Sequence, residues 1–75
     1  MNSDFKSILD MVSNEDIMFQ YEGVSQLREA LNYAQDSQLN RFLVESFCKQ
    51  LVALVKQPVI MEEISNEIKC KLATY

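Results

Sequence analysis

Two cysteines and two pairs of neighbouring acids are the side chains of this sequence best suited to chemistry. Cys48 precedes Lys49, and a nearby cation lowers the pKa of a thiol and makes it reactive. The second cysteine, Cys70, is too far along the chain to form a Cys-x-x-Cys pair with it. We expect two free, mostly buried thiols in a reducing compartment. A disulfide and a reactive thiol are the alternatives.

The acid pairs are Glu15–Asp16 and Glu62–Glu63. Paired carboxylates perform acid–base chemistry only when they face each other, and adjacent positions on a helix do not. Both pairs fall where a helix is expected to begin, and acids stabilise that end of a helix. We therefore interpret them as helix-terminal residues and not as a catalytic pair.

Several classes of active site are excluded by composition. The chain of 75 residues contains no histidine and a single glycine. It therefore holds no Ser–His or Cys–His dyad, no zinc site of the usual kind, no P-loop and no dinucleotide fingerprint. We expect a protein without catalytic residues, metal ligands or cofactors of its own.

The charge and hydropathy of the chain argue against further classes of protein. The net charge is −4 and the basic residues are scattered, which argues against binding to nucleic acid. No apolar run is long enough to cross a membrane, and charges interrupt the N-terminal segment, unlike a signal peptide. We expect an intracellular protein, cytoplasmic or nuclear. One proline and one glycine favour an all-α fold.

Apolar periodicity predicts two helices in the first half of the chain. Ser3 is the expected cap of the first helix, and Asn14 is the expected cap of the second. The first helix has one apolar face, formed by Phe5, Ile8, Leu9 and Val12. The second has two neighbouring stripes. One is formed by Ile17, Tyr21, Val24, Leu27 or Arg28, and Leu31, and the other by Phe19, Gly23, Leu27, Ala30 and Ala34.

The second half predicts two more main helices. The polar stretch 32–40 is expected to break the chain, with Asp36 or Ser37 capping a short helical turn through Leu39 and Phe42. A third helix spans 44–55, and Pro58 stops it. A last helix runs from Val59 to the end. The expected buried residues are Phe47, Leu51, Leu54 and Val55 on the third helix, and Ile60, Ile64, Ile68, Leu72 and Tyr75 on the last.

The two halves also resemble each other. "ILDMVSNEDIM" begins at Ile8 and "LVALVKQPVIM" begins at Leu51, an offset of 43 residues. A helical period of about 40–47 residues is typical of armadillo and HEAT repeats. We predict a single armadillo/HEAT-like domain over 1–75, with a first partial repeat over about 1–35 and a second repeat over 36–75.

The single glycine, Gly23, falls inside the second predicted helix. The side chains of its stripe are small where two helices would cross. We therefore expect that a neighbouring helix comes close at Gly23 and leaves no room for a side chain. A kink is the alternative.

From 14 to 75, the chain resembles the armadillo-like region of HECT-type ubiquitin ligases of the ubiquitin-fusion-degradation and thyroid-receptor-interactor family. The matching pieces are "SQLREAL", "DSQL", "FLVESFCKQLVALV", "VIM" and "CKLATY". The resemblance implies a piece of a substrate-recognising helical repeat. It also implies a catalytic cysteine in a separate HECT domain, which these residues do not contain.

A weaker resemblance links "SNEDIMFQYEG" to the first armadillo repeats of importin-α. That family binds basic peptides through Trp and Asn pairs, and the first pair would fall on Ser25 and Glu29. The chain has no tryptophan, so that ladder is missing.

We therefore expect a non-catalytic helical-repeat module that binds a protein partner. Its candidate contact residues are Gln26, Glu29, Lys69 and Lys71, on the second and last predicted helices. The alternative is a small all-helical accessory subunit that forms a homo-oligomer or docks into a larger assembly, because fewer than two repeats leave an apolar flank exposed.

Overall fold

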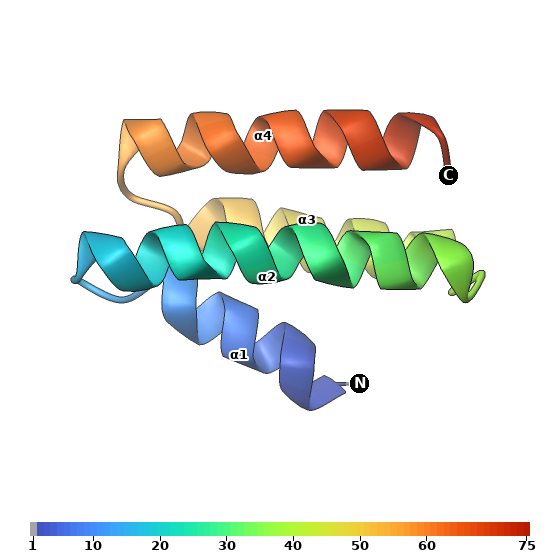
Figure 1. Ribbon diagram of the computed structural model, residues 1–75, viewed down its shortest axis with the longest axis horizontal. Helices are drawn as coiled ribbons and strands as arrows, with labels where there is room; N and C mark the ends of the chain where they lie inside the picture. The colour runs from blue at the N-terminus through green and yellow to red at the C-terminus, as the bar shows by residue number, and fades with distance from the viewer. Residues whose placement is uncertain (1) are drawn as a thin grey trace.

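Four helices form the protein, in a computed structural model that describes residues 2–75, with side chains from Phe5 onward. They are α1 (Asn2–Val12), α2 (Ile17–Asp36), α3 (Arg41–Leu54) and α4 (Pro58–Ala73). Successive helices alternate in direction, so α2 and α4 run the same way and α3 runs back between them (Figure 1). The described residues contain no strand, and the predicted all-α class is confirmed.

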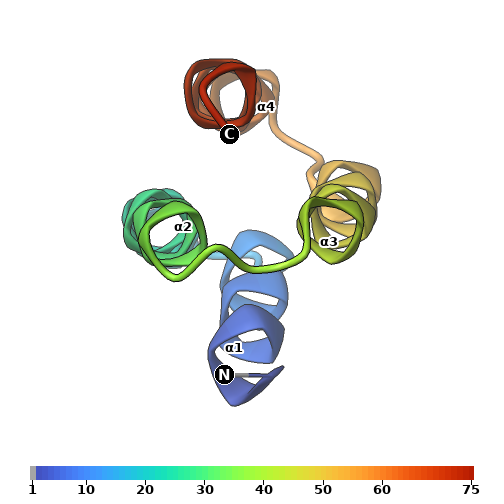
Figure 2. The same ribbon diagram turned by 90° about the vertical axis from the view of Figure 1, so that its right-hand side faces the viewer.

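Viewed end-on, the helices occupy the corners of a diamond (Figure 2). α2 and α3 face each other across it, α4 lies on one side and α1 on the other. α2 makes the most extensive contacts, with α1 and with α4, whereas α3 packs more lightly against both. α1 crosses the others obliquely, so its N-terminal half diverges from the long axis (Figure 1).

The start of α2 differs from the prediction. Asp16, and not Asn14, is the cap, because an Asp16 carboxylate oxygen accepts a hydrogen bond of 2.9 Å from the amide of Met18. The side chain of Asn14 instead accepts from the amide of Asp16 at 2.8 Å and holds the preceding turn. The first helix begins at Asn2, so Ser3 lies within it; the cap predicted there rests on a side chain outside the described ones.

The predicted break at 32–40 is wrong over its first half. α2 continues through Asp36, with Ser37 at its C-terminal end. No separate turn is capped by Asp36 or Ser37; the cap of α3 is Asn40, whose side chain accepts from the amide of Phe42 at 2.8 Å. Burial of Ala34 shows the reason: the polar residues lie on the solvent side of a helix that is still anchored to the core.

Pro58 has a different position from the one predicted. α3 ends at Leu54, and Pro58 begins α4. The first position of a helix suits proline, because its missing N–H has no partner there in any case.

The core lies between all four helices. Among the predicted inward residues, Phe47, Leu51, Ile60 and Ile64 are buried, whereas Leu54 is 39% exposed. The complete set of buried apolar residues is Ile8, Val12, Val24, Leu27, Leu31, Ala34, Val44, Phe47, Cys48, Leu51, Ile60 and Ile64. Partly buried Val55, Ile68, Leu72 and Tyr75 pack against this cluster.

The first turns of α2 depart most from the predicted stripes. Ile17, Phe19 and Tyr21 are exposed, and Gln20 is buried instead. The amide nitrogen of the Gln20 side chain donates to the carbonyl of Asn14 at 2.6 Å, so this polar residue closes the loop between α1 and α2. The buried stripe runs through Gln20, Gly23, Val24, Leu27, Leu31 and Ala34.

The offset of 43 residues relates the two helix pairs only in part. Ile8 and Leu51, which it aligns on α1 and α3, are both buried. On α2 and α4, it aligns an exposed Ile17 with a fully buried Ile60, and an exposed Tyr21 with a fully buried Ile64. The aligned residues therefore agree in burial at Ile8 and Leu51, and they differ after the connecting loop.

Gly23 lies where the end of α1 packs tightly against α2. A Cβ atom there would be 2.8 Å from Cγ1 of Val12 and 3.1 Å from Cβ of Met11. The backbone of Gly23 is not left-handed, and α2 is a single helix through it. Close approach of a neighbouring helix, as predicted, is the reason for the glycine.

Candidate interaction surfaces

The residues predicted to bind a partner lie on two helices. Glu29 and Lys69 are exposed, whereas Gln26 and Lys71 are half-buried. The side chain of Gln26 donates a hydrogen bond of 3.1 Å to Glu22, one turn earlier on α2. Lys69 and Lys71 are two positions apart, which places them roughly 200° apart around α4. The four residues therefore do not form a single surface.

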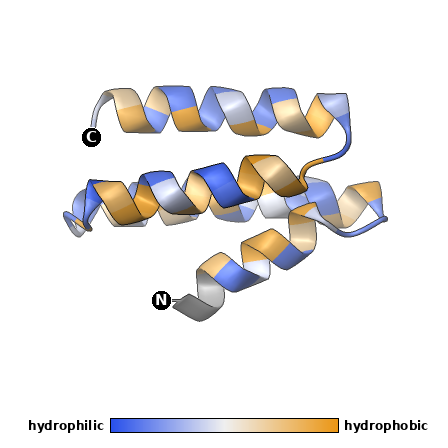
Figure 3. Ribbon diagram, turned by 180° about the vertical axis from the view of Figure 1, so that it is seen from behind, coloured by the Kyte–Doolittle hydropathy of each residue, from blue (hydrophilic) through white to orange (hydrophobic). Residues whose placement is uncertain are grey.

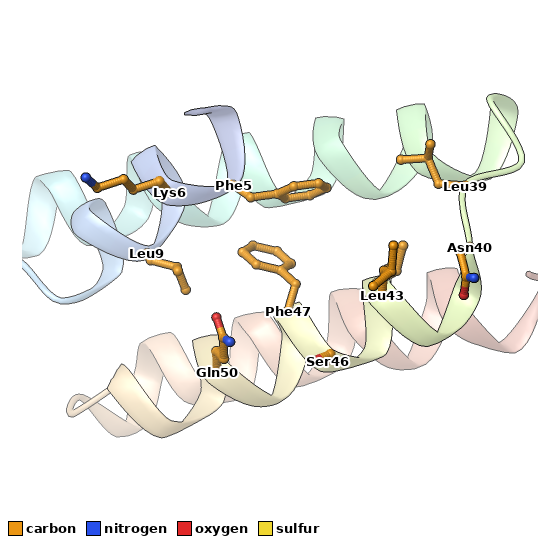
Figure 4. A pocket seen from close by; sticks show the side chains of 10 residues that line it. Phe5, Lys6, Leu9, Leu39, Asn40, Leu43, Ser46, Phe47 and Gln50 are labelled. Atoms are coloured by element: carbon orange, nitrogen blue, oxygen red, sulfur yellow. The ribbon is translucent and has the colours of Figure 1, made fainter. Parts of the chain in front are cut away.

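A groove of about 490 Å³ lies between α1 and α3. Phe5, Lys6 and Leu9 come from α1, and Leu39 and Asn40 close one end from the α2–α3 connection (Figure 4). The α3 wall consists of Leu43, Val44, Ser46, Phe47 and Gln50. The sequence did not predict this groove, because it depends on the oblique crossing of α1 over α3.

An aromatic pair forms the floor of the groove. The ring centres of Phe5 and Phe47 are 4.5 Å apart, and the rings are tilted by 46° (Figure 4). Such tilted contacts are favourable and hold both rings in place. Leu43, in contrast, is 66% exposed although it lines the groove. A fixed apolar floor beside an uncovered leucine is suited to receiving apolar side chains from another molecule.

The connection that closes the groove is held from α4. The hydroxyl of Tyr75 donates to the carbonyl of Leu39 and lies 3.4 Å from the carbonyl of Ala34. Nearby, the side chain of Gln35 donates to the hydroxyl of Thr74 at 2.7 Å. The C-terminal end of α4 therefore fixes the wall of a groove on the other side of the molecule.

The groove carries little charge. Among its described lining residues, Lys6 is the only ionisable one; Asn40, Ser46 and Gln50 are neutral and exposed. Lys6 lies at the opposite end from Leu39 and Asn40 (Figure 4). The lining thus combines an apolar floor, a neutral polar rim and one cation.

A second hollow, of about 380 Å³, lies between α3 and α4. It is lined by Glu45, Cys48, Lys49, Val52, Ile68 and Leu72. Burial, with a smaller effect of Glu45, raises the pKa of the Cys48 thiol to about 11. A neutral thiol is a poor nucleophile, so the structure favours a core cysteine at this position over a reactive one.

The two thiols are not alike. Both are free, Cys48 buried and Cys70 exposed. The expectation that both are mostly buried is wrong for Cys70, because it lies on the solvent side of α4. A disulfide between them is not formed.

Large apolar side chains are exposed at further places. Met18 is 71% exposed at the start of α2, and Phe42 is 74% exposed at the start of α3. Orange segments in Figure 3 show how hydrophobic residues are distributed along all four helices. The exposed large apolar residues are Ile17, Met18, Phe19, Tyr21, Tyr33, Phe42, Leu43, Leu54 and Val59.

Comparison with known proteins gives no relative: no family model, no curated protein and no solved structure matches the chain. Within residues 2–75, no helix is both long enough and apolar enough to span a membrane. Across the same part of the chain, no three Cys, Asp or Glu side chains gather as the ligands of a metal ion.

Proposed function

We propose that the chain is a non-catalytic, helical protein–protein interaction module that acts inside the cell. The exposed apolar residues support this most, above all Leu43, which lines a groove with a fixed aromatic floor. Contiguous apolar surface on a folded domain is typical of a site that another protein covers. The charged candidates Glu29 and Lys69 are secondary contacts in this proposal.

The resemblance to HECT-type ligases extends the proposal. It makes the module a piece of an armadillo-like substrate-recognition region, whose catalytic domain lies outside these residues. The agreement in burial of Ile8 with Leu51 supports a helical repeat, and the disagreement of Ile17 with Ile60 limits that support. A parent reading frame that continues into a HECT domain is the expected finding; a parent frame without one contradicts this extension.

The alternative is a small accessory subunit that binds a second copy of itself. The same exposed apolar residues support it, because a symmetric dimer would also cover them. The mass of the chain in solution, measured by light scattering, distinguishes the interaction module from the self-associating subunit. The interaction module is expected to have the mass of a monomer over a wide range of concentrations, and a stable dimer would favour the alternative.

Selection from a displayed library of helical peptides tests the proposed function directly. The folded chain is expected to enrich peptides that bind saturably, one per chain. A triple variant, Phe19→Asp, Phe42→Asp and Leu43→Asp, is the control, since all three side chains are exposed and their replacement leaves the core unchanged. Equal enrichment on the wild type and on this variant would contradict the proposal.

A further inference from the structure

We propose that the groove between α1 and α3 binds an amphipathic helix of a partner protein, with a carboxylate of that helix opposite Lys6. The inference rests on the proposed function and names the partner class. It follows from the shape of the groove, from its apolar floor and from the charge of its lining.

The groove lies between two helices, the setting in which a third helix is commonly bound. α1 and α3 form the walls, and Leu39 closes one end (Figure 4). Binding of an amphipathic helix in such a groove inserts apolar side chains spaced three and four residues apart. The neutral rim residues Ser46 and Gln50 are exposed to water, so they offer a small molecule little to fix its orientation.

The apolar floor of the groove supplies the favourable free energy of binding. Phe5 and Phe47 already pack on each other, so binding would order little that is mobile. Leu43 is 66% exposed beside them, and covering it removes apolar surface from water. An incoming leucine or phenylalanine would cover Leu43 beside the ring pair.

The charge of the lining specifies the partner. The chain contains 11 acidic and 7 basic residues, yet the one ionisable side chain among the described lining residues is a lysine. Asp10, one turn beyond Lys6 on α1, does not line the groove. A carboxylate on the partner helix would find a cation there, whereas a basic partner would meet a like charge.

A second copy of the chain fits less well. In a two-fold dimer closed through this groove, the two concave surfaces would face each other, and neither copy would insert a helix into the other. Each copy also carries a net charge of −4, which opposes association. These features favour a different protein as the occupant.

The test uses the peptides selected on the folded chain and three exposed positions. Leu43→Asp is expected to weaken their binding by at least about tenfold, because it places a charge where apolar side chains are buried. Phe42→Asp is the matched control: Phe42 is the neighbour on α3 and is 74% exposed, but it does not line the groove. It is expected to leave binding unchanged.

Substitution of Lys6 tests whether a carboxylate of the partner helix lies opposite this lysine. The selected peptides are expected to carry Asp or Glu beside their apolar face, and Lys6→Glu to weaken them about threefold or more, the size of a surface ion pair. Lys56→Glu is the control, since it changes the net charge equally and lies in the α3–α4 connection, away from the groove. Replacing the peptide's acids by glutamine is expected to remove the difference between the two variants.

Three outcomes would overturn the proposal. Peptides that bind Leu43→Asp as tightly as the wild type would place their site elsewhere and leave the interaction function standing. Peptides without acids, insensitive to Lys6→Glu, would refute the charged partner. A dimer that dissociates on Leu43→Asp would make a second copy the occupant. Unchanged helical circular dichroism, and a Leu43→Ala variant tested beside it, exclude misfolding as the cause.

Discussion

Gly23 shows how one residue sets the distance between two helices. The position that a Cβ would occupy is 2.8 Å from a methyl group of Val12 and 3.3 Å from the Val12 backbone nitrogen. Val12 is buried and β-branched, so its side chain has little freedom to turn away. The cost of a glycine within a helix is therefore offset by the packing of α1 on α2.

Gly23→Ala is expected to destabilise the fold by about 1–2 kcal/mol, because overpacking exceeds the gain in helix propensity. Gly23→Leu is expected to cost about 1–3 kcal/mol or more. Denaturant unfolding measures both. The exposed Ser25→Ala on the same helix is the control. In a Val12→Ala background the cost of Gly23→Ala should shrink; an equal cost in both backgrounds would place the strain elsewhere.

Cys48 makes stability depend on pH in the alkaline range. Its thiol ionises near pH 9.0 when unfolded and at about 11 when folded, because burial disfavours the thiolate. A raised pKa of this kind stabilises the fold fully below pH 9.0, and the contribution is lost as the pH rises through about 11. The loss is on the order of 1–3 kcal/mol.

The measurement is the free energy of unfolding of the wild type and of Cys48→Ala at several pH values. Every other ionisable group is common to the two proteins, so the difference between their free energies of unfolding isolates the thiol. The difference in free energy of unfolding between the wild type and Cys48→Ala is expected to become smaller as the pH rises above 9. The control is Cys70→Ala, at the exposed cysteine, whose free energy of unfolding should differ from that of the wild type by the same amount at every pH. A pH-independent difference for Cys48→Ala as well would refute the buried neutral thiol.

At the scale of elements, apolar periodicity located four helices, and local hydrogen bonding set their ends. Asn14 and Asp16 are equally good caps by residue type, and only the fold shows that Asp16 accepts from Met18 while Asn14 holds the turn. The stretch 32–40 contains mostly polar residues, which predicts a loop. Leu31 and Ala34 keep its first half helical by packing in the core, a tertiary effect that residue types do not reveal.

The cap of α2 can be tested by itself. Asp16→Ala is expected to destabilise the fold by about 0.5–2 kcal/mol, because the amide of Met18 loses its acceptor. Glu15→Ala, at the preceding and also exposed residue, should change the unfolding free energy much less. Thermal or denaturant unfolding of both variants is the measurement. A larger effect at Glu15 than at Asp16 would contradict the assignment of the cap.

At the scale of the whole molecule, α2 links the two sides of the fold. It packs on α1 and α4, and the ion pair between Arg28 and Glu67, at 2.8 Å, joins it to α4 at the surface. The sequence could not predict the α1–α3 groove, since Phe5 and Phe47 lie far apart in the chain and meet only through this arrangement. Leu43 lines this groove and is 66% exposed, but its residue type alone does not distinguish it from Phe42, which is equally apolar and lies outside the groove.

We propose above that a partner helix binds in the α1–α3 groove. Nuclear magnetic resonance of the labelled chain, titrated with a peptide selected on it, tests this most directly. We expect the amide signals of Lys6 and Leu9 on α1 and of Leu43 on α3 to shift saturably, while that of Lys69 stays in place. Shifts centred on Gln26, Glu29, Lys69 or Lys71, with the groove unchanged, would contradict the proposal.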